Sequence, residues 1–179
     1  VNNEHSVKKL IVASSMSTYG EGGYQCENCG VIEPPLRTEK QMSKKQWELI
    51  CGDCKEELKS IPTPETKEQD CNSIYAYSKK YQEDMVMSIG NTYGLPVTAL
   101  RYFNVYGPRQ SLSNPYTGVI AIFLSRLKNN NAPLIFEDGL QTRDFISVHD
   151  IINANILSMN QRSANYEIFN VGTSIASSI

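Results

Sequence analysis

A tyrosine and a lysine stand four positions apart in the segment from Tyr75 to Lys79. On a helix these two side chains lie on one face, one turn apart. An unperturbed tyrosine titrates at about pH 10, so it removes a proton at neutral pH only where a nearby cation stabilises the phenolate. Lys79 can supply that cation, and the pair therefore predicts a tyrosine that acts as a base. The alternative is a solvated lysine on an ordinary helix surface.

Four of the five cysteines form two Cys-x-x-Cys pairs, Cys26 with Cys29 and Cys51 with Cys54, separated by 21 residues. This spacing approximates that of two zinc knuckles, in which four thiolates complete a tetrahedral shell. A complete shell leaves no position for a substrate, so the pattern predicts a structural zinc ion that folds this segment. The alternative is a set of unligated buried cysteines. We expect the fifth, Cys71, to be a plain small apolar residue.

Strands and helices are predicted to alternate around these residues. Apolar runs indicate strands at 8–15, 96–103, 133–136 and 166–171, and helical spacing indicates helices at 73–92, 118–129 and 149–159. Ser73 or Asn72 is placed to cap the helix that carries Tyr75, and Gly94 is placed to end it. The alternation predicts an α/β fold with a Rossmann-like, doubly wound parallel sheet.

The chain divides into three predicted segments. Residues 24–60 are rich in cysteines, charges and turn residues, which indicates an inserted zinc-knuckle module. Residues 1–23 and 61–179 are predicted to be Rossmann-like portions, the second continuing into a substrate-binding region. The strand ending at Ser15 places its hydroxyl groups at the carboxyl end of a parallel strand, where ligands bind in open α/β sheets.

Charge and hydropathy exclude several classes of partner. The 17 basic and 19 acidic residues are interspersed, and the net charge of −2 favours neither nucleic acid nor a membrane surface. The insert holds six basic and seven acidic residues, so it lacks a basic face for nucleic acid. No apolar run reaches the roughly 18 residues of a membrane span, and no signal peptide begins the chain. We expect a cytoplasmic protein, in which paired cysteines bind metal.

Four blocks outside the insert occur in a fixed order, at 14–20, 75–79, 100–109 and 139–150. Together they resemble the extended short-chain dehydrogenase/reductase family, specifically its nucleotide-sugar epimerases and dehydratases of the UDP-glucose 4-epimerase type. The resemblance implies NAD as cofactor, a nucleotide-diphosphate sugar as substrate and a homodimer. A similar cysteine-bearing insert is expected in epimerases that act on dTDP-activated 6-deoxysugars.

The resemblance implies a role for each matching position. Tyr75 is then the base, Ser15 the hydroxyl that bonds the reacting sugar oxygen, and Lys79 the residue that holds the nicotinamide ribose. The other implied cofactor contacts are Ser14, Tyr102 and Phe103, and the implied substrate contacts are Ser17, Asn104 and Arg143. Asn104 and Arg143 match diphosphate-binding positions, for which a planar guanidinium is well suited. Two further residues of these blocks have simple structural interpretations. Arg109 is then a surface cation, and Asp144 is a partner of a backbone amide.

The implied reaction is epimerisation at C4 through a 4-keto intermediate. A hydride leaves C4 for NAD while Tyr75 accepts the hydroxyl proton, and the hydride returns to the other face of the sugar. The 4,6-dehydratases of the family carry carboxylic acids where this chain has Met16 and Ser17, which favours epimerisation. A 4,6-dehydratase, a 4-reductase and a catalytically silent, zinc-stabilised interaction module remain alternatives.

The glycine-rich G-x-x-G-x-x-G loop of the family does not occur in these 179 residues. That loop cradles the NAD pyrophosphate at a helix N-terminus. We therefore expect the chain to be part of a longer protein in which the loop precedes residue 1.

Overall fold

The computed structural model of the chain describes residues 7–112 and 118–179. Its centre is a parallel sheet of three strands in the order β1 (Leu10–Ser15), β5 (Val97–Tyr102) and β9 (Glu167–Val171). These strands confirm three of the four predicted ones. The middle strand, β5, is buried from Val97 to Arg101, as expected for a parallel strand with both faces covered.

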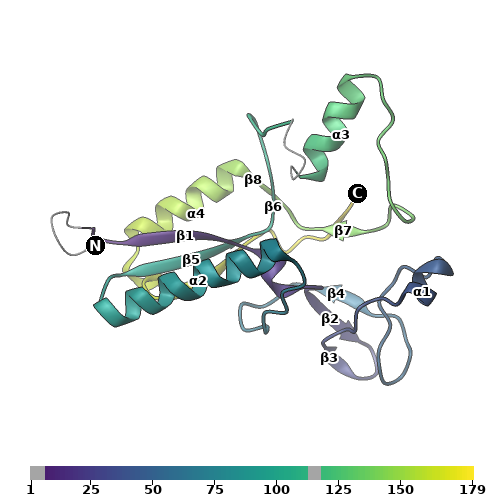
Figure 1. Cartoon of the computed structure of the whole chain (residues 1–179), viewed down its shortest axis with the longest axis horizontal. Helices are drawn as coiled ribbons and strands as arrows, with labels where there is room; N and C mark the ends of the chain where they lie inside the picture. Colours follow the sequence, from purple (N-terminus) through teal and green to yellow (C-terminus); the bar gives the residue numbers. More distant parts are fainter. Residues whose placement is uncertain (1–6, 113–117) are drawn as a thin grey trace.

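Two helices, α2 (Ile74–Tyr93) and α4 (Val148–Asn160), cover opposite faces of this sheet (Figure 1). Successive residues of a strand point to opposite faces. On β5, Arg101 bonds to Glu83 of α2, whereas the neighbouring Leu100 packs with Ile151 of α4. The predicted α/β architecture with a parallel sheet is therefore confirmed.

The ends of α2 follow from its local sequence. The Ser73 hydroxyl oxygen accepts the N–H of Ala76 at 3.1 Å, and Gly94 ends the helix in the left-handed conformation with φ 65°. Gly90 allows the helix to approach the sheet, because a Cβ at that position would lie 2.4 Å from a methyl carbon of Val97. The helix predicted at 73–92 is confirmed, with Ser73 as its cap.

The cysteine-bearing segment forms a small antiparallel sheet of its own. Its middle strand, β2 (Gly23–Cys26), pairs with β3 (Gly30–Ile32) and β4 (Lys59–Ile61), and the short helix α1 (Glu39–Ser43) lies between β3 and β4 in the sequence. Figure 1 shows this sheet beyond the carboxyl end of β1. The division at 1–23, 24–60 and 61–179 stays a prediction, and residues 1–6 lie outside the described residues.

Several short elements complete the fold. β6 (Asn104–Tyr106) pairs with β8 (Phe145–Ser147) in parallel, and β7 (Thr142–Arg143) pairs with β10 (Ser177–Ser178) in antiparallel orientation. The 3-10 helices η1 (Met16–Tyr19) and η2 (Arg162–Ala164) follow β1 and α4. The helices α3 (Val119–Lys128) and α4 confirm those predicted at 118–129 and 149–159. Within 7–112 and 118–179, no helix has the length and apolar content needed to cross a membrane.

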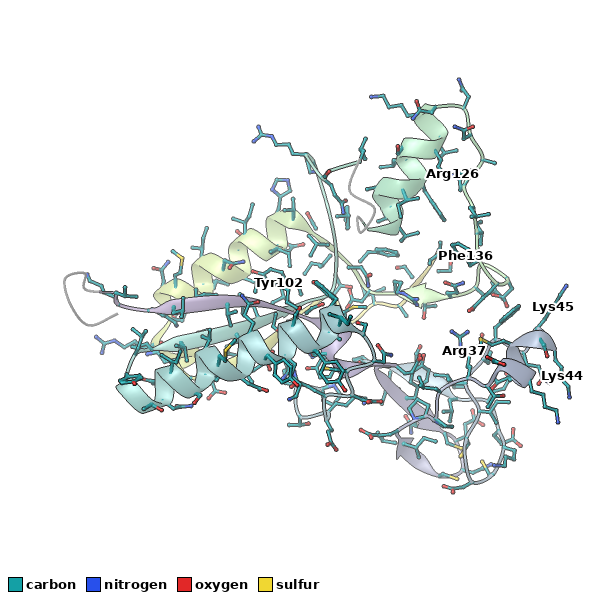
Figure 2. All side chains as sticks on the ribbon, viewed as in Figure 1. Arg37, Lys44, Lys45, Tyr102, Arg126 and Phe136 are labelled. Carbon is teal, nitrogen blue, oxygen red and sulfur yellow. The ribbon has the colours of Figure 1, made fainter. Side chains whose placement is uncertain are left out.

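The strand predicted at 133–136 is wrong. This segment lies in the connection between α3 and β7, and it pairs with no strand in the described part of the chain. Phe136, which lies on the connection in Figure 2, is 69% exposed. An apolar run forms a strand only where a neighbouring strand bonds to its backbone groups, and Pro133 has no N–H to contribute.

Candidate active site

Two serines end β1 at the carboxyl edge of the central sheet. The Ser15 hydroxyl oxygen accepts the backbone N–H of Ser17 at 3.2 Å and the Ser17 hydroxyl at 2.9 Å. A serine hydroxyl has one proton to donate, and both of these bonds use Ser15 as an acceptor, which leaves its proton for a further acceptor. Ser14 is 3% exposed, and its hydroxyl oxygen has no hydrogen-bond partner among the described residues.

The first turns of α2 carry Tyr75 and Lys79, and this helix packs against β1 and η1. Lys79 Nζ donates to the carbonyl oxygen of Ala13 at 2.9 Å, so it reaches the strand that carries Ser15. The Tyr75 side chain is 56% exposed. The structure thus joins the lysine of the predicted pair to β1 and leaves the tyrosine accessible.

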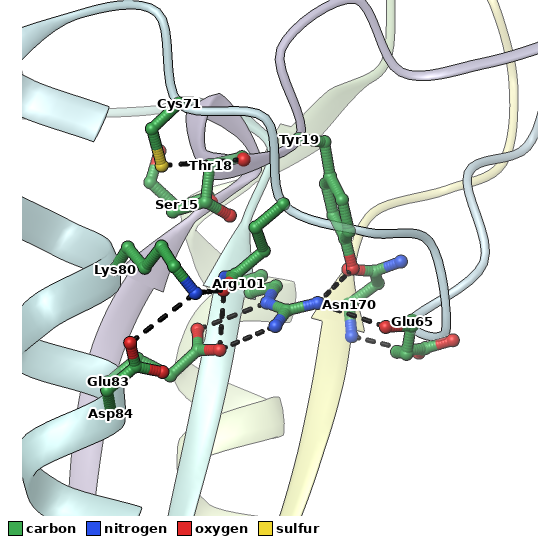
Figure 3. Close-up of polar contacts among 11 residues, drawn as sticks. Ser15, Thr18, Tyr19, Glu65, Cys71, Lys80, Glu83, Asp84, Arg101 and Asn170 are labelled. Carbon is green, nitrogen blue, oxygen red and sulfur yellow. Dashed lines mark hydrogen bonds and ion pairs between the residues drawn. The ribbon is translucent and has the colours of Figure 1, made fainter. Parts of the chain in front are cut away.

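A buried ion pair, which the sequence did not indicate, ties α2 to β5 (Figure 3). Arg101 Nε and Nη2 donate to the two carboxylate oxygens of Glu83 at 3.1 and 2.5 Å, and the two side chains are 5% and 2% exposed. Burial lowers the pKa of Arg101, but the Glu83 carboxylate and the Tyr19 phenol outweigh this and raise it above its ordinary value. The pair holds the helix of Tyr75 on the sheet.

The same arginine continues into a chain of polar contacts. Arg101 Nη1 donates to the Tyr19 phenol oxygen at 2.6 Å, and that phenol donates to Asn170 Oδ1 at 2.8 Å (Figure 3). The contacts join η1, β5 and β9, whose residues are far apart in the sequence. Burial raises the Tyr19 pKa, so the phenol remains an O–H donor at neutral pH.

A cavity of about 680 Å³ lies beyond the carboxyl ends of the three central strands. It is lined by η1 and the loop after it, by β4 and the linker after it, by the residues that follow β5 and β9, and by 142–144. Ligands of open parallel sheets bind at this edge. Of the predicted site residues, Phe103, Asn104 and Arg143 line the cavity, whereas Ser15, Ser17, Tyr75 and Lys79 are absent from its described lining.

Asn104 and Arg143, the two predicted diphosphate-binding residues, differ in how far their side-chain donors are already bonded to the protein. Asn104 Nδ2 donates to the carbonyl oxygen of Asp144 at 3.2 Å and to Met16 Sδ at 3.4 Å. The Arg143 guanidinium donates to the carbonyl oxygen of Thr142 at 2.7 Å, and the residue is exposed. Arg143 therefore has further N–H groups to offer to a ligand.

Asp144 and Tyr102, which also belong to the matching blocks, have protein partners. The Asp144 carboxylate accepts the N–H groups of Thr173 and Ser174 at 2.9 and 2.8 Å, which matches its simpler interpretation as a partner of backbone amides. The Tyr102 phenol bonds to the Asn155 side chain at 2.8–3.0 Å, on the face of the sheet covered by α4.

The four paired cysteines come together at the small sheet, where Cys26 ends β2 and the other three lie outside the strands. Their sulfur atoms all lie within 4.8 Å of one another, and Cys26 Sγ lies 3.3 Å from Cys54 Sγ. Four sulfurs around a tetrahedral zinc, each at about 2.3 Å, are about 3.8 Å apart, so this arrangement fits such an ion. Backbone N–H groups of Cys54 and Asp53 lower the Cys51 pKa to about 7, which favours a thiolate there.

Comparisons with known proteins identify the family of this chain. The model of the NAD dependent epimerase/dehydratase family matches residues 2–172. The chain therefore belongs to this family. It is 30% identical over 175 residues to the dTDP-L-rhamnose 4-epimerase of Burkholderia thailandensis, an alignment that covers 97% of this chain and 47% of that protein.

Two solved structures extend the comparison. The UDP-glucose 4-epimerase of Thermotoga maritima with UDP-glucose is 31% identical, with a TM-score of 0.70, covering 97% of this chain and 44% of that one. The UDP-glucose 4-epimerase of Thermus thermophilus with NAD is 28% identical, with a TM-score of 0.64, covering 96% of this chain and 45% of that one. The fold is Rossmann-like, and the chain spans less than half the length of these relatives.

Proposed function

We propose that this chain is part of an NAD-dependent enzyme that epimerises a nucleotide-diphosphate sugar at C4 through a 4-keto intermediate. The observation that carries the proposal is the bond between α2 and β1. Lys79, one turn along the helix from Tyr75, reaches the carbonyl oxygen of Ala13, two residues before Ser15. This bond supports a base and a hydroxyl that act at the same edge of the sheet.

Each side chain has a separate task in this proposal. Tyr75 acts as a phenolate that accepts the proton of the C4 hydroxyl, and the Lys79 ammonium stabilises the phenolate's negative charge before the reaction. Ser15 donates a hydrogen bond from its hydroxyl to the sugar oxygen and keeps its proton. Asn104 and Arg143 hold the diphosphate, which anchors the sugar beside the base.

NAD supplies the hydride acceptor when it is bound. The residues for its nicotinamide riboside end are Tyr75, Lys79, Tyr102 and Ser14. The buried Ser14 hydroxyl, which has no partner among the described residues, fits a group that bonds a further molecule. No residue of this chain supplies the glycine-rich pyrophosphate loop.

Epimerisation is favoured over 4,6-dehydration by the two residues that follow Ser15. Elimination of water between C5 and C6 requires an additional acid and base. Met16 accepts a hydrogen bond from Asn104 and lines the cavity, and the Ser17 hydroxyl donates to Ser15. Neither side chain is a carboxylic acid. A 4-reductase remains the alternative within the family.

We further propose that Cys26, Cys29, Cys51 and Cys54 bind a structural zinc ion. The proximity of the four sulfurs supports this. The two buried members, Cys26 and Cys51, belong to the core of the small sheet with Leu49 and Leu58. The ion would thus stabilise a module whose apolar core is small.

The test uses the full-length gene product, purified and assayed for bound NAD(H) and for interconversion of 4-epimeric UDP- and dTDP-sugars. We expect Tyr75→Phe to lower the rate about 10²- to 10⁴-fold while NAD remains bound. Tyr77→Phe is the matched control, because Tyr77 lies on the same helix and stacks on Tyr81. Equal rates for the two variants would refute the assignment of the base.

The rival class of function gives a different result in the same assay. A protein that contains zinc but retains no nicotinamide at full length is the catalytically silent interaction module. The predicted homodimer and the cytoplasmic location stay predictions. Gel filtration of the same sample measures the first.

A further inference from the structure

The small cysteine-bearing sheet forms one side of the cavity. Tyr24 of β2 and Ser60 of β4 are paired across these strands, and both line the cavity. The linker 61–65 after β4 continues the same wall. The cavity that holds Arg143 is therefore built jointly by the Rossmann-like portion and by the insert.

Tyr24 connects the thiolate cluster to this cavity. Its ring packs against the core that contains Cys26 and Cys51, and it lines the cavity as well. Tyr24 and Cys26 are two residues apart on β2, so their side chains lie on the same face of the strand. An interaction that holds Cys26 in place therefore also restrains the position of Tyr24 on the same strand.

The wall is also attached to the rest of the molecule. Asn170 donates from its side chain to the carbonyl oxygen of Thr63 at 2.7 Å, and its backbone N–H donates to the Glu65 carboxylate at 2.9 Å. On the other side of the insert, Arg37 pairs with Glu137 at 2.9 Å (Figure 2 labels Arg37). These contacts join the linker after the insert to β9, and the insert itself to the connection between α3 and β7.

Arg143 is the one cationic side chain among the described residues that line the cavity, whose lining also includes Glu21, Glu65 and Asp144. Arg143 belongs to no ion pair in the part of the chain that the structure describes. The half-buried Tyr24 side chain carries a phenol O–H that can donate a hydrogen bond, and it lines the same cavity as the Arg143 guanidinium.

We propose that Tyr24 is a substrate-binding residue whose phenol, presented by the cysteine-bearing sheet, donates a hydrogen bond to the diphosphate of the nucleotide sugar beside Arg143. This rests on the proposed function for the identity of the ligand. The insert then contributes to the active site, because the thiolate cluster holds β2, the strand that carries Tyr24.

The test compares Tyr24→Phe with the wild type in the full-length protein. Calorimetric titration with UDP and with dTDP measures the Kd of each ligand. Because the variant loses one hydrogen bond to a charged group, we expect Kd to rise about tenfold for the ligand that the wild type binds more tightly. Phenylalanine keeps the ring that packs on Cys26 and Cys51, so zinc and NAD content should not change. Gln25→Ala is the matched control, because Gln25 is the exposed neighbour on β2.

Kinetics give a second measurement. If the wild type interconverts 4-epimeric sugars, Tyr24→Phe should raise KM about tenfold and change kcat less than about twofold, as for lost uniform binding. Unchanged Kd for both nucleoside diphosphates would overturn the proposal, and so would a loss confined to sugar-bearing ligands. A wild type that binds these diphosphates but converts no sugar would count against the proposed function alone.

Discussion

Lys79 of α2 donates a hydrogen bond from its Nζ to the main-chain carbonyl oxygen of Ala13 in β1, across 2.9 Å. The two residues are 66 positions apart, and the whole cysteine-bearing insert lies between them in the sequence. This contact places the ammonium group at the strand that ends in Ser15, one helical turn from Tyr75. The insert is thus accommodated while α2 keeps its contact with the strand that ends in Ser15.

Replacing Lys79 with methionine tests the task of its charge. We expect Lys79→Met to lower kcat about 10²- to 10⁴-fold, because no ammonium then stabilises negative charge on the Tyr75 oxygen. The control is Lys80→Met, since Lys80 pairs with Asp84 on another side of the helix. An unchanged kcat in Lys79→Met would show that the charge is dispensable.

Breaking the buried ion pair tests what holds α2 on the sheet. Glu83→Gln leaves the Arg101 guanidinium buried without a countercharge, and we expect the free energy of unfolding to fall by about 3–5 kcal/mol. Urea unfolding measures this change. The neighbouring Asp84→Asn removes a partly exposed helix pair and should cost less than about 0.5 kcal/mol.

The double variant Glu83→Gln/Arg101→Met separates an unpaired charge from lost packing. It removes the uncompensated charge, so it should recover part of the stability lost in Glu83→Gln alone. If Glu83→Gln costs no more than Asp84→Asn, the buried pair is not what fastens the helix to β5.

Removal of the metal tests the four-cysteine site. Metal analysis should find about one zinc per chain, and Cys29→Ser should abolish it because the tetrahedral shell loses a ligand. Cys71→Ser is the control, since the Cys71 sulfur contacts the Thr18 carbonyl oxygen rather than the cluster. Trp47 is the single tryptophan of this chain and lies in the insert. The difference in fluorescence between the wild type and Trp47→Phe therefore reports on the insert.

That tryptophan signal should change when a chelator removes zinc, while bound NAD should stay in place. Zinc that persists at the wild-type level in Cys29→Ser would refute the four-thiolate site. Loss of zinc from Cys71→Ser as well would place the fifth cysteine among the ligands.

Features that depend on neighbouring residues were predictable. Ser73 caps α2 because its hydroxyl oxygen reaches an N–H three residues later, and Gly94 ends the helix because it adopts positive φ without strain. The apolar run before Ser15 forms β1 of the central sheet. The two Cys-x-x-Cys pairs indicated a common site, and their sulfurs do meet. In each case the deciding interaction spans a few residues or a repeated local motif.

Features that depend on which elements meet were not predictable. Glu83 stands four residues after Lys79, a spacing that suits an ion pair on the helix surface, yet it bonds to Arg101 of β5. The run at 133–136 is as apolar as a strand, but no described strand lies beside it. Pairing with a distant element decides both outcomes.

The amino-acid sequence by itself determined the helix that carries Tyr75 and Lys79, the strand that ends in Ser15 and the four paired thiols. Only the tertiary structure decided that Tyr24 of the insert shares a cavity with Arg143, 119 positions later in the chain. The physical reason is that local dihedral preferences and side-chain caps act over a few residues. A cavity wall instead depends on the packing of β2 and β4 against elements that the sequence places far away.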